Sequence, residues 1–159
     1  MPIPDFIVDL RRRVGHDLLW LSGVTAVVRR EHEGRTQVLL VRRADDGRWT
    51  PVTGIIDPGE QPAAAAEREV LEEADVVAVA ERLTRVHTLP PMTYDNGDRA
   101  QYLDLTFALR WVSGEPHPAD GENSAAGWFD LEDLPPLDDE MTARLAAGLA
   151  AGPAATFER

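Results

Sequence analysis

Three glutamates, Glu69, Glu72 and Glu73, are spaced so that a helix would bring their carboxylates together. At about 100° per residue, positions i, i+3 and i+4 fall on one helix face. The stretch over 62–73 is rich in strong helix formers, and turn residues precede it. Its apolar residues define a second face roughly opposite, and they are Ala63, Ala66, Val70, Ala74 and Val77. We expect a helix that packs by one face and carries a carboxylate arc on the other.

The chemistry indicated by this arc is the binding of a hard divalent cation. Like charges at this spacing destabilise an isolated helix by a few tenths of a kcal/mol per pair, so a purely structural reason for them is hard to find. Oxygen ligands without a nearby cysteine or histidine favour Mg²⁺ or Mn²⁺ over Zn²⁺. Arg68 lies one turn before Glu72 and can pair with it. The plain alternative is a solvated acidic helix face.

The segment from Gly54 to Val76 resembles the Nudix box, the signature of the Nudix hydrolase family. The box reads Gly, five residues, Glu, seven residues, then Arg-Glu-apolar-any-Glu-Glu-any-Gly-apolar. The matching residues, all in register, are Gly54, Glu60, Arg68, Glu69, Val70, Glu72, Glu73 and Val76. The last glycine of the box is replaced by Asp75. Because that position lies where the helix ends, we expect a left-handed backbone, which aspartate tolerates better than most residues.

The resemblance implies the Nudix fold, an α/β/α sandwich with a mixed β-sheet. It also implies Mg²⁺-dependent (or Mn²⁺-dependent) hydrolysis of the phosphoanhydride bond of a nucleoside diphosphate linked to another moiety. A nucleotide sugar such as ADP-ribose and a nucleoside triphosphate are the leading substrates, and no residue decides between these and a dinucleotide. The alternative is a catalytically idle Nudix-like module that binds a nucleotide as a sensor. The intact Arg-Glu and Glu-Glu pairs of the box argue against that alternative.

The resemblance also implies a metal site within the box. Glu69 and Glu73 match the usual metal ligands, Glu72 often joins them, and the backbone carbonyl of Gly54 commonly completes the site. Arg68 matches the residue that orients the box glutamates.

The general base is either a box glutamate or a glutamate from a distant loop, and Glu122 is the distant candidate. It lies in a turn-rich segment, and such loops carry functional side chains over a rigid sheet. Asp120 is its substitute, and a solvated loop carboxylate is the alternative. The predicted catalytic residues are thus Arg68, Glu69, Glu73 and Glu122, and Glu60 is assigned to the turn before the helix.

Candidate substrate contacts lie outside the box. Arg43 ends a predicted strand and resembles a phosphate contact of the family, although a surface arginine is an equal alternative. Tyr94 offers an aromatic face for a base, and Asn96 and Asp98 offer polar groups for ribose or base edges. Because Asn-Gly is a strong hairpin signal, a simple turn is the alternative there.

Strand and turn patterns surround the box. β-branched and aromatic runs predict strands over 24–30, 37–43, 82–89 and 101–112, the first two joined as a hairpin. A loop is expected over 113–126. This order favours a mixed sheet between helices.

Length and patterning suggest a single Nudix hydrolase domain over 1–159. Its expected N-terminal extension over 1–20 contains a short helix in which Phe6, Ile7, Leu10 and Val14 share a face. A C-terminal helix is expected over 138–152, capped by Asp138.

Composition limits the partners. The chain has no cysteine, which excludes disulfides and thiolate catalysis, and all sixteen of its basic residues are arginine. The net charge of −12 argues against binding a nucleic-acid polymer, whose affinity depends on neutralising many phosphates. No run approaches 18 apolar residues and no signal-peptide pattern opens the chain, so no membrane association is expected. We expect a cytoplasmic enzyme with a small nucleotide substrate, and a homodimer is compatible with the sequence.

Overall fold

The computed structural model describes residues 3–159, so the first two residues of the expected extension lie outside the described part. Its helices are α1 (Asp5–Val14), α2 (Pro62–Ala74) and α3 (Asp139–Leu149). Its strands are β1 (Leu19–His32), β2 (Arg35–Arg43), β3 (Trp49–Thr50), β4 (Val52–Ile55), β5 (Val77–Thr88), β6 (Met92–Thr93), β7 (Arg99–Ser113), β8 (Asn123–Asp130) and β9 (Thr156–Phe157).

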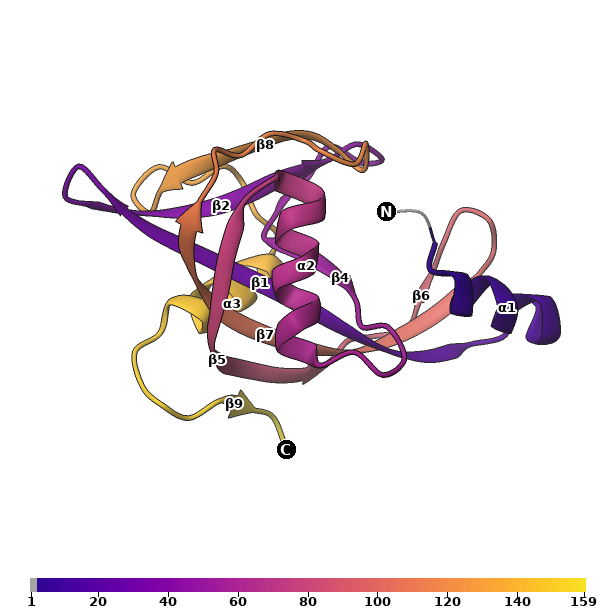
Figure 1. Ribbon diagram of the computed structural model, residues 1–159. Coiled ribbons are helices and arrows are strands. Elements are labelled where there is room, and N and C mark those ends of the chain that lie inside the picture. Colours follow the sequence, from indigo (N-terminus) through magenta and orange to yellow (C-terminus); the bar gives the residue numbers. More distant parts are fainter. Residues whose placement is uncertain (1–2) are drawn as a thin grey trace.

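These strands form one mixed sheet. Hydrogen bonding follows the order β3-β2-β1-β7-β5-β9, and β8 pairs with β2, β4 with β1 and β6 with β7. β1 runs parallel to β7 and β5 parallel to β9, whereas the other pairs are antiparallel. In Figure 1, α2 lies in front of the sheet, α3 lies behind it, and α1 sits at one end beside β6. The expected α/β/α sandwich with a mixed sheet is confirmed.

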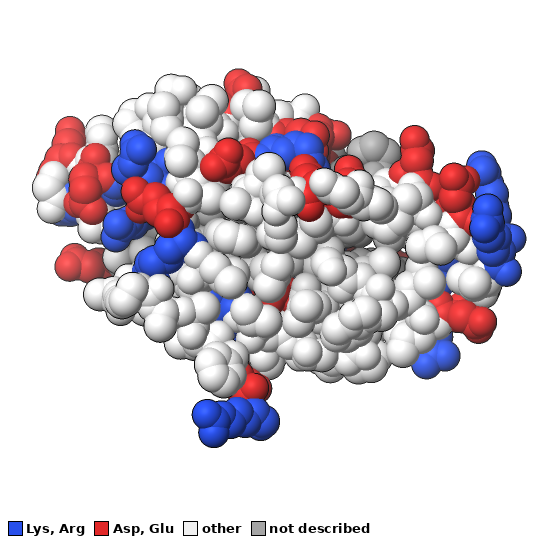
Figure 2. Space-filling model, turned by 60° about the horizontal axis from the view of Figure 1, so that its bottom comes forward, with Lys and Arg blue, Asp and Glu red and all other residues white. Residues whose placement is uncertain are grey.

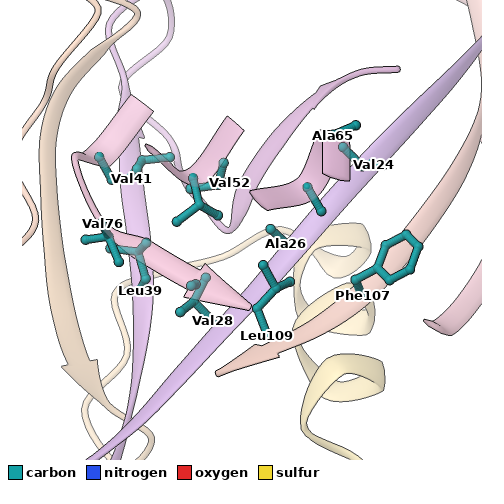
Figure 3. Packing of buried hydrophobic residues seen from close by; sticks show 14 residues of the cluster. Val24, Ala26, Val28, Leu39, Val41, Val52, Ala65, Val76, Phe107 and Leu109 are labelled. Carbon is teal, nitrogen blue, oxygen red and sulfur yellow. The ribbon is translucent and has the colours of Figure 1, made fainter. Parts of the chain in front are cut away.

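The larger core lies between α2 and the sheet. Figure 3 shows Val24, Ala26 and Val28 of β1 packed with Leu109 of β7 and Ala65 of α2. All five side chains are almost fully buried. Because successive strand residues point to opposite faces, this alternation along β1 places α2 on one defined face.

The opposite face of β1 holds α3. Val27 packs against Leu145 of α3. A buried polar network also links α3 to β1 and β7. Arg144 Nη1 donates to Thr25 Oγ1 at 3.0 Å and lies 3.4 Å from Asp104 Oδ1. Thr25 Oγ1 in turn donates to Asp104 at 2.8 Å. Buried charges stay in a fold when they are paired in this way.

The short helix expected over 4–14 in the N-terminal extension is confirmed as α1 (Asp5–Val14). α1 ends before Gly15, whose φ of 60° leaves the helical region, and β1 has already begun at Leu19. The expected apolar face, however, is wrong in part. Ile7 is buried, whereas Leu10 and Val14 are exposed, because the apolar contacts of α1 with the sheet come from its first turns, at Phe6 and Ile7.

Three other boundaries differ from expectation. Val77 opens β5 with an exposed side chain, so it is not part of the apolar face of α2. β8 begins at Asn123 inside the expected loop over 113–126. α3 is capped as predicted, since the Asp138 carboxylate accepts from Met141 N at 2.8 Å, but extended backbone at Ala150 ends it before 152.

Charge is unevenly spread over the surface. On the face in Figure 2, charged side chains gather toward the two ends and the upper edge, and no continuous basic band crosses the middle. Within residues 3–159, no helix combines the length and the apolar character that crossing a membrane requires.

Asp75 adopts the backbone that the sequence predicted. Its φ of 53° and ψ of 36° are left-handed, and its N–H donates to Leu71 O at 3.0 Å to close α2. The substituted residue of the box therefore keeps the conformation for which glycine is usually selected.

Replacing Asp75 with glycine should change the free energy of unfolding by less than about 1 kcal/mol, because relief of left-handed strain offsets the extra freedom of the unfolded chain. Hydrolytic activity should stay nearly unchanged. Denaturant unfolding and steady-state kinetics measure both, with Asp75→Ala as the control that should be less stable than either. A collapse of activity in Asp75→Gly would show a chemical role for this carboxylate.

Candidate active site

Arg68 joins the separate parts of the box. Its Nε and Nη2 donate to the two carboxylate oxygens of Glu60 at 2.8 and 2.9 Å, and Nη2 also donates to Ile55 O at 3.1 Å. Its Nη1 donates to Glu69 Oε1 at 2.9 Å and to Glu72 Oε2 at 3.0 Å. The hydrogen bonds from Arg68 lower the pKa of Glu60. Arg68 is thus placed to hold the turn, β4 and two helix carboxylates in one arrangement.

Glu69 lies against a glycine of β4. Its side chain is only 1% exposed, and a Cβ atom at Gly54 would lie 2.0 Å from its carboxylate carbon. Only a residue without a side chain leaves room for this carboxylate. Glu69 Oε2 is buried without a hydrogen-bond partner among the described residues. A buried oxygen of this kind needs a compensating ligand.

Glu73 lies one turn further along α2 and is 4% exposed. Asn123 Nδ2 donates to its Oε2 at 2.9 Å, and Ala119 N donates to its backbone carbonyl at 3.2 Å. The loop before β8 is therefore tied directly to the box helix. Sequence reasoning missed Asn123, whose only signal was its place next to Glu122.

Burial changes the acidity of both carboxyl groups. It raises the pKa of Glu69 to about 7, although Arg68 acts in the opposite direction. It raises the pKa of Glu73 to about 8, against the hydrogen bond from Asn123. Desolvation disfavours an anion, and Arg68 offsets this only in part at Glu69, so further positive charge is needed to keep both groups ionised at neutral pH.

The predicted arc of three carboxylates is divided. Glu69 and Glu73 point into the interior, whereas Glu72 is nearly half exposed and bonded to Arg68. Among residues 3–159, no three acidic or histidine side chains converge as a ready-made metal cage. Glu69 and Glu72 still share one donor, Arg68 Nη1, as expected of neighbours on one arc, but they differ in burial because Gly54 leaves room for Glu69 beneath β4.

The candidate substrate residues fall into two cavities. Tyr94, Asn96 and Asp98 line a cavity of about 240 Å³ beside α1, which we call the α1 cavity, and Glu122 lines it too. These three residues belong to the hairpin of β6 and β7, so the predicted turn is confirmed. Their contact with substrate stays a prediction.

Arg43 is separate from that group. It lines a second cavity of about 280 Å³, which extends to Gly54 and to α3 and which we call the α3 cavity. Arg43 Nε donates to Asp45 Oδ1 at 2.9 Å, so a phosphate would share this arginine with a carboxylate. The hydrogen bond to Asp45 is the main cause that raises the pKa of Arg43, and the charge of Glu73 in the box adds to it.

The sequence profile of the NUDIX domain matches residues 20–149. The chain belongs to the Nudix hydrolase family. The match runs from β1 to the last residue of α3, so α1 lies outside the shared Nudix region.

Sequence relatives include two kinds of Nudix protein. The NAD-capped RNA hydrolase NudC of Deinococcus radiodurans is 33% identical over 110 residues, which are 68% of this chain and 36% of the relative. The NudC of Pseudomonas syringae pv. tomato is 31% identical over 64% of this chain and 34% of its own length. A MutT-like protein of Streptomyces ambofaciens is 33% identical over 77% of this chain and 68% of its own length. The chain spans about a third of the length of the NudC relatives.

Solved Nudix structures share the fold. An ADP-ribose pyrophosphatase from Streptococcus suis 89-1591 is 25% identical with a TM-score of 0.60, covering 87% of this chain and 98% of that chain. A MutT NUDIX hydrolase from Burkholderia pseudomallei is 28% identical with a TM-score of 0.56, covering 81% and 98%. These similarities concern the sheet and its helices. The substrate of this chain has to be inferred from its own residues.

Nudix hydrolases generally use divalent metal ions, and the residues here fit one. The fit rests on the unpartnered Glu69 Oε2 and on the buried carboxylate of Glu73 close by on the same helix. Hard oxygen donors of this kind suit Mg²⁺ or Mn²⁺. Glu69, Glu73 and the Gly54 carbonyl would hold the ion, and Glu72 could join through its second oxygen, because only its Oε2 accepts from Arg68.

Without added metal, the free energy of unfolding should fall as pH rises from about 5 to about 8. The folded-state pKa values of Glu69 and Glu73, about 7 and about 8, lie above the ordinary value of 4.5. The native state therefore binds more protons than the unfolded state in this window, and stability is lost as both groups ionise. A cation competes with those protons, so Mn²⁺ should raise the Tm more at about pH 9 than at about pH 6.

Thermal melts with and without Mn²⁺ at the two pH values measure this difference. The control is Glu67→Gln, which also removes one negative charge from α2. Glu67 accepts from Ala80 N and does not face Gly54, so it lies outside the proposed cation site. It should keep the wild-type dependence on pH. A Mn²⁺ effect of equal size at both pH values would contradict the assignment of these carboxylates.

Proposed function

We propose that this protein hydrolyses the phosphoanhydride bond of a nucleoside diphosphate linked to another moiety, with Mg²⁺ or Mn²⁺. The observation that carries the proposal is a pair of buried carboxylates on one helix, Glu69 and Glu73. Glu69 packs against Gly54, and its Oε2 has no hydrogen-bond partner among the described residues. A bound divalent cation would neutralise the diphosphate and lower the pKa of an attacking water. The protein's own groups must position that water and accept its proton.

Each box residue has a distinct part in this proposal. Glu69 and Glu73 hold the cation, Glu72 can join them, and the carbonyl of Gly54 completes the site. Arg68 is a positioning residue, because its hydrogen bonds orient Glu69 and Glu72 while anchoring Glu60.

Glu122 is proposed as the general base. It lines the α1 cavity, and its backbone N–H donates to Asp120 Oδ1 at 3.0 Å, a contact that shapes the loop. The same loop is bonded to Glu73 through Asn123 and Ala119. This connection supports a base that is set over the metal site by a short, tied loop.

The partner that we propose is a small nucleotide. The names of the NudC relatives refer to NAD-capped RNA, but the net charge of −12 disfavours contact with an RNA chain here. An idle nucleotide sensor is the alternative function, and burial of two costly carboxylates with no structural partner for Glu69 Oε2 argues against it. A cytoplasmic location and a homodimer stay predictions from the sequence.

A screen of purified protein with ADP-ribose, NAD, a dinucleoside polyphosphate and ATP tests the function. We expect hydrolysis of at least one compound with Mg²⁺ or Mn²⁺, loss of the reaction with a chelator, and recovery on readdition of metal. Chromatography of the products shows which anhydride bond breaks. Binding of a nucleotide with no product from any of the compounds would favour the sensor.

A further inference from the structure

We propose that α1 is a substrate-binding element, and that the substrate carries a cyclic group on each side of its diphosphate. One group occupies the α1 cavity and the other occupies the α3 cavity. The inference rests on the proposed function and narrows its substrate class to dinucleotides and nucleotide sugars, rather than nucleoside triphosphates.

α1 is firmly docked on the sheet. Arg11 donates to three backbone carbonyls, those of Gly15 at 3.1 Å, Asp17 at 2.6 Å and Arg99 at 2.7 Å. Ile7 is buried against Leu21 and Ala100. A helix held by both polar and apolar contacts can form a permanent wall of a binding site.

The chemistry of the α1 cavity suits a ring with polar edges. Ile7, Leu21 and Ala100 supply apolar surface, and the hydroxyl groups of Tyr94 and Tyr102 meet at 2.7 Å. Arg11 also lines it, and the buried Nε of Arg11 lies 3.5 Å from Asp98 Oδ1 as an ion pair. Small-molecule sites combine apolar walls with a few polar groups in this way.

The α1 cavity opens toward the box. Ile3 and Pro4, just before α1, line both this cavity and a groove formed by Asp57, Arg68 and Glu72. Glu122, the proposed base, lines the cavity as well. A group bound beside α1 would therefore remain connected to a diphosphate at the metal site.

The α1 and α3 cavities meet next to the metal site. Both are lined by Ile55, Tyr94 and Tyr102, and the α3 cavity also reaches Gly54. Gly54 is the residue against which Glu69 packs. A diphosphate held beside Gly54 would therefore lie close to both cavities.

This arrangement discriminates between substrate classes. A nucleoside triphosphate has its ring system at one end of the phosphate chain and would leave one cavity unfilled. A dinucleotide or nucleotide sugar would fill both, and each cavity alone is slightly below the roughly 300–1,000 Å³ of complete small-molecule sites. Binding energy from both groups can then hold the scissile bond in position.

Reciprocal cavity filling tests the inference. Ile7→Phe places a larger side chain in the α1 cavity and so reduces its free volume, and Met141→Phe does the same in the α3 cavity. Leu10→Phe makes the matched change on the exposed face of α1. AMP and ribose 5-phosphate, the two halves of ADP-ribose, serve as competitive inhibitors. Melting curves verify folding. If Ile7→Phe fails to fold, Leu21→Phe is used in its place.

We expect Ile7→Phe to raise the Ki of one half by at least about tenfold and Met141→Phe to raise the Ki of the other half, each leaving the second half within about threefold. Leu10→Phe should change neither. Wild-type kcat/KM should be at least about 100-fold higher for ADP-ribose or NAD than for ATP. Equal efficiency on ATP, or a variant pair that weakens the same half, overturns the inference while leaving the hydrolase function standing. No hydrolysis of any compound overturns the function itself.

Discussion

Replacing Glu69 or Glu73 with glutamine should lower hydrolysis at saturating Mg²⁺ by at least about 100-fold while the fold survives. Each substitution keeps the side-chain shape but removes one negative charge from the proposed cation site. The Arg68 contact to position 69 and the Asn123 contact to position 73 can both be kept by an amide oxygen. The loss should therefore reflect metal chemistry rather than a collapsed box.

Stability separates the two explanations. Because burial raises the pKa of both carboxyl groups, a neutral amide removes a charge that the metal-free fold accommodates poorly. At about pH 8 and without metal, the variants should melt no lower than the wild type. Glu67→Gln is the control on the same helix and should keep wild-type turnover. Full turnover in Glu69→Gln and Glu73→Gln would show that the box is not the active site.

Local sequence signals predicted much of the fold. The alanine-rich segment after a turn gave α2, the turn at 33–34 joined β1 and β2, and Asp138 capped α3. The left-handed backbone of Asp75 was predicted from its position at the helix end. Each of these features depends on residues that are close together in the chain, where propensity and capping act.

The inner geometry of the site was not predictable in the same way. Glu69 is buried because Gly54, fifteen positions earlier in the numbering, leaves space beside it. Glu73 of α2 accepts from Asn123, the first residue of strand β8, fifty positions later. Helical spacing placed both carboxylates on one arc but did not predict their burial, since spacing carries no information about what packs against a helix.

The two cavities show the same limit. The turn containing Tyr94 and the helix containing Ile7 were each expected separately, but only the sheet brings them together. The β6–β7 hairpin is local, but docking of α1 beside it, against Leu21 and Ala100, creates the space between them. The α1 cavity therefore depends on contacts between segments far apart in sequence.

Glu122 is the residue whose role can be separated from the metal helix. It lies on the loop before β8, and it lines the α1 cavity rather than the interior beside Gly54. As the general base, it would act on the attacking water only in the transition state. A change at this position should therefore affect turnover more than substrate binding.

Replacing Glu122 with glutamine should lower kcat by at least about 100-fold and leave KM within about threefold. The acidic limb of the pH–rate profile should also disappear, because that limb reports protonation of the base. Saturating metal is needed in these assays, so that the raised pKa values of Glu69 and Glu73 do not impose an acidic limb of their own. Melting with Mn²⁺ should match the wild type, since the cation site stays intact.

Glu115→Gln is the matched control, because Glu115 lies in the same loop and pairs with Arg30 away from the cavity. It should preserve both kcat and the profile. A loss of at most about tenfold in Glu122→Gln, with the acidic limb in place, would mark a peripheral contact. The base would then be Glu69 or Glu73, one of which would have to exchange its hold on the cation for a proton within each turnover. Glu69 accepts from Arg68 with Oε1 and has only Oε2 left, so it is poorly suited both to hold the cation and to accept a proton. For this reason the geometry favours Glu122 as the base.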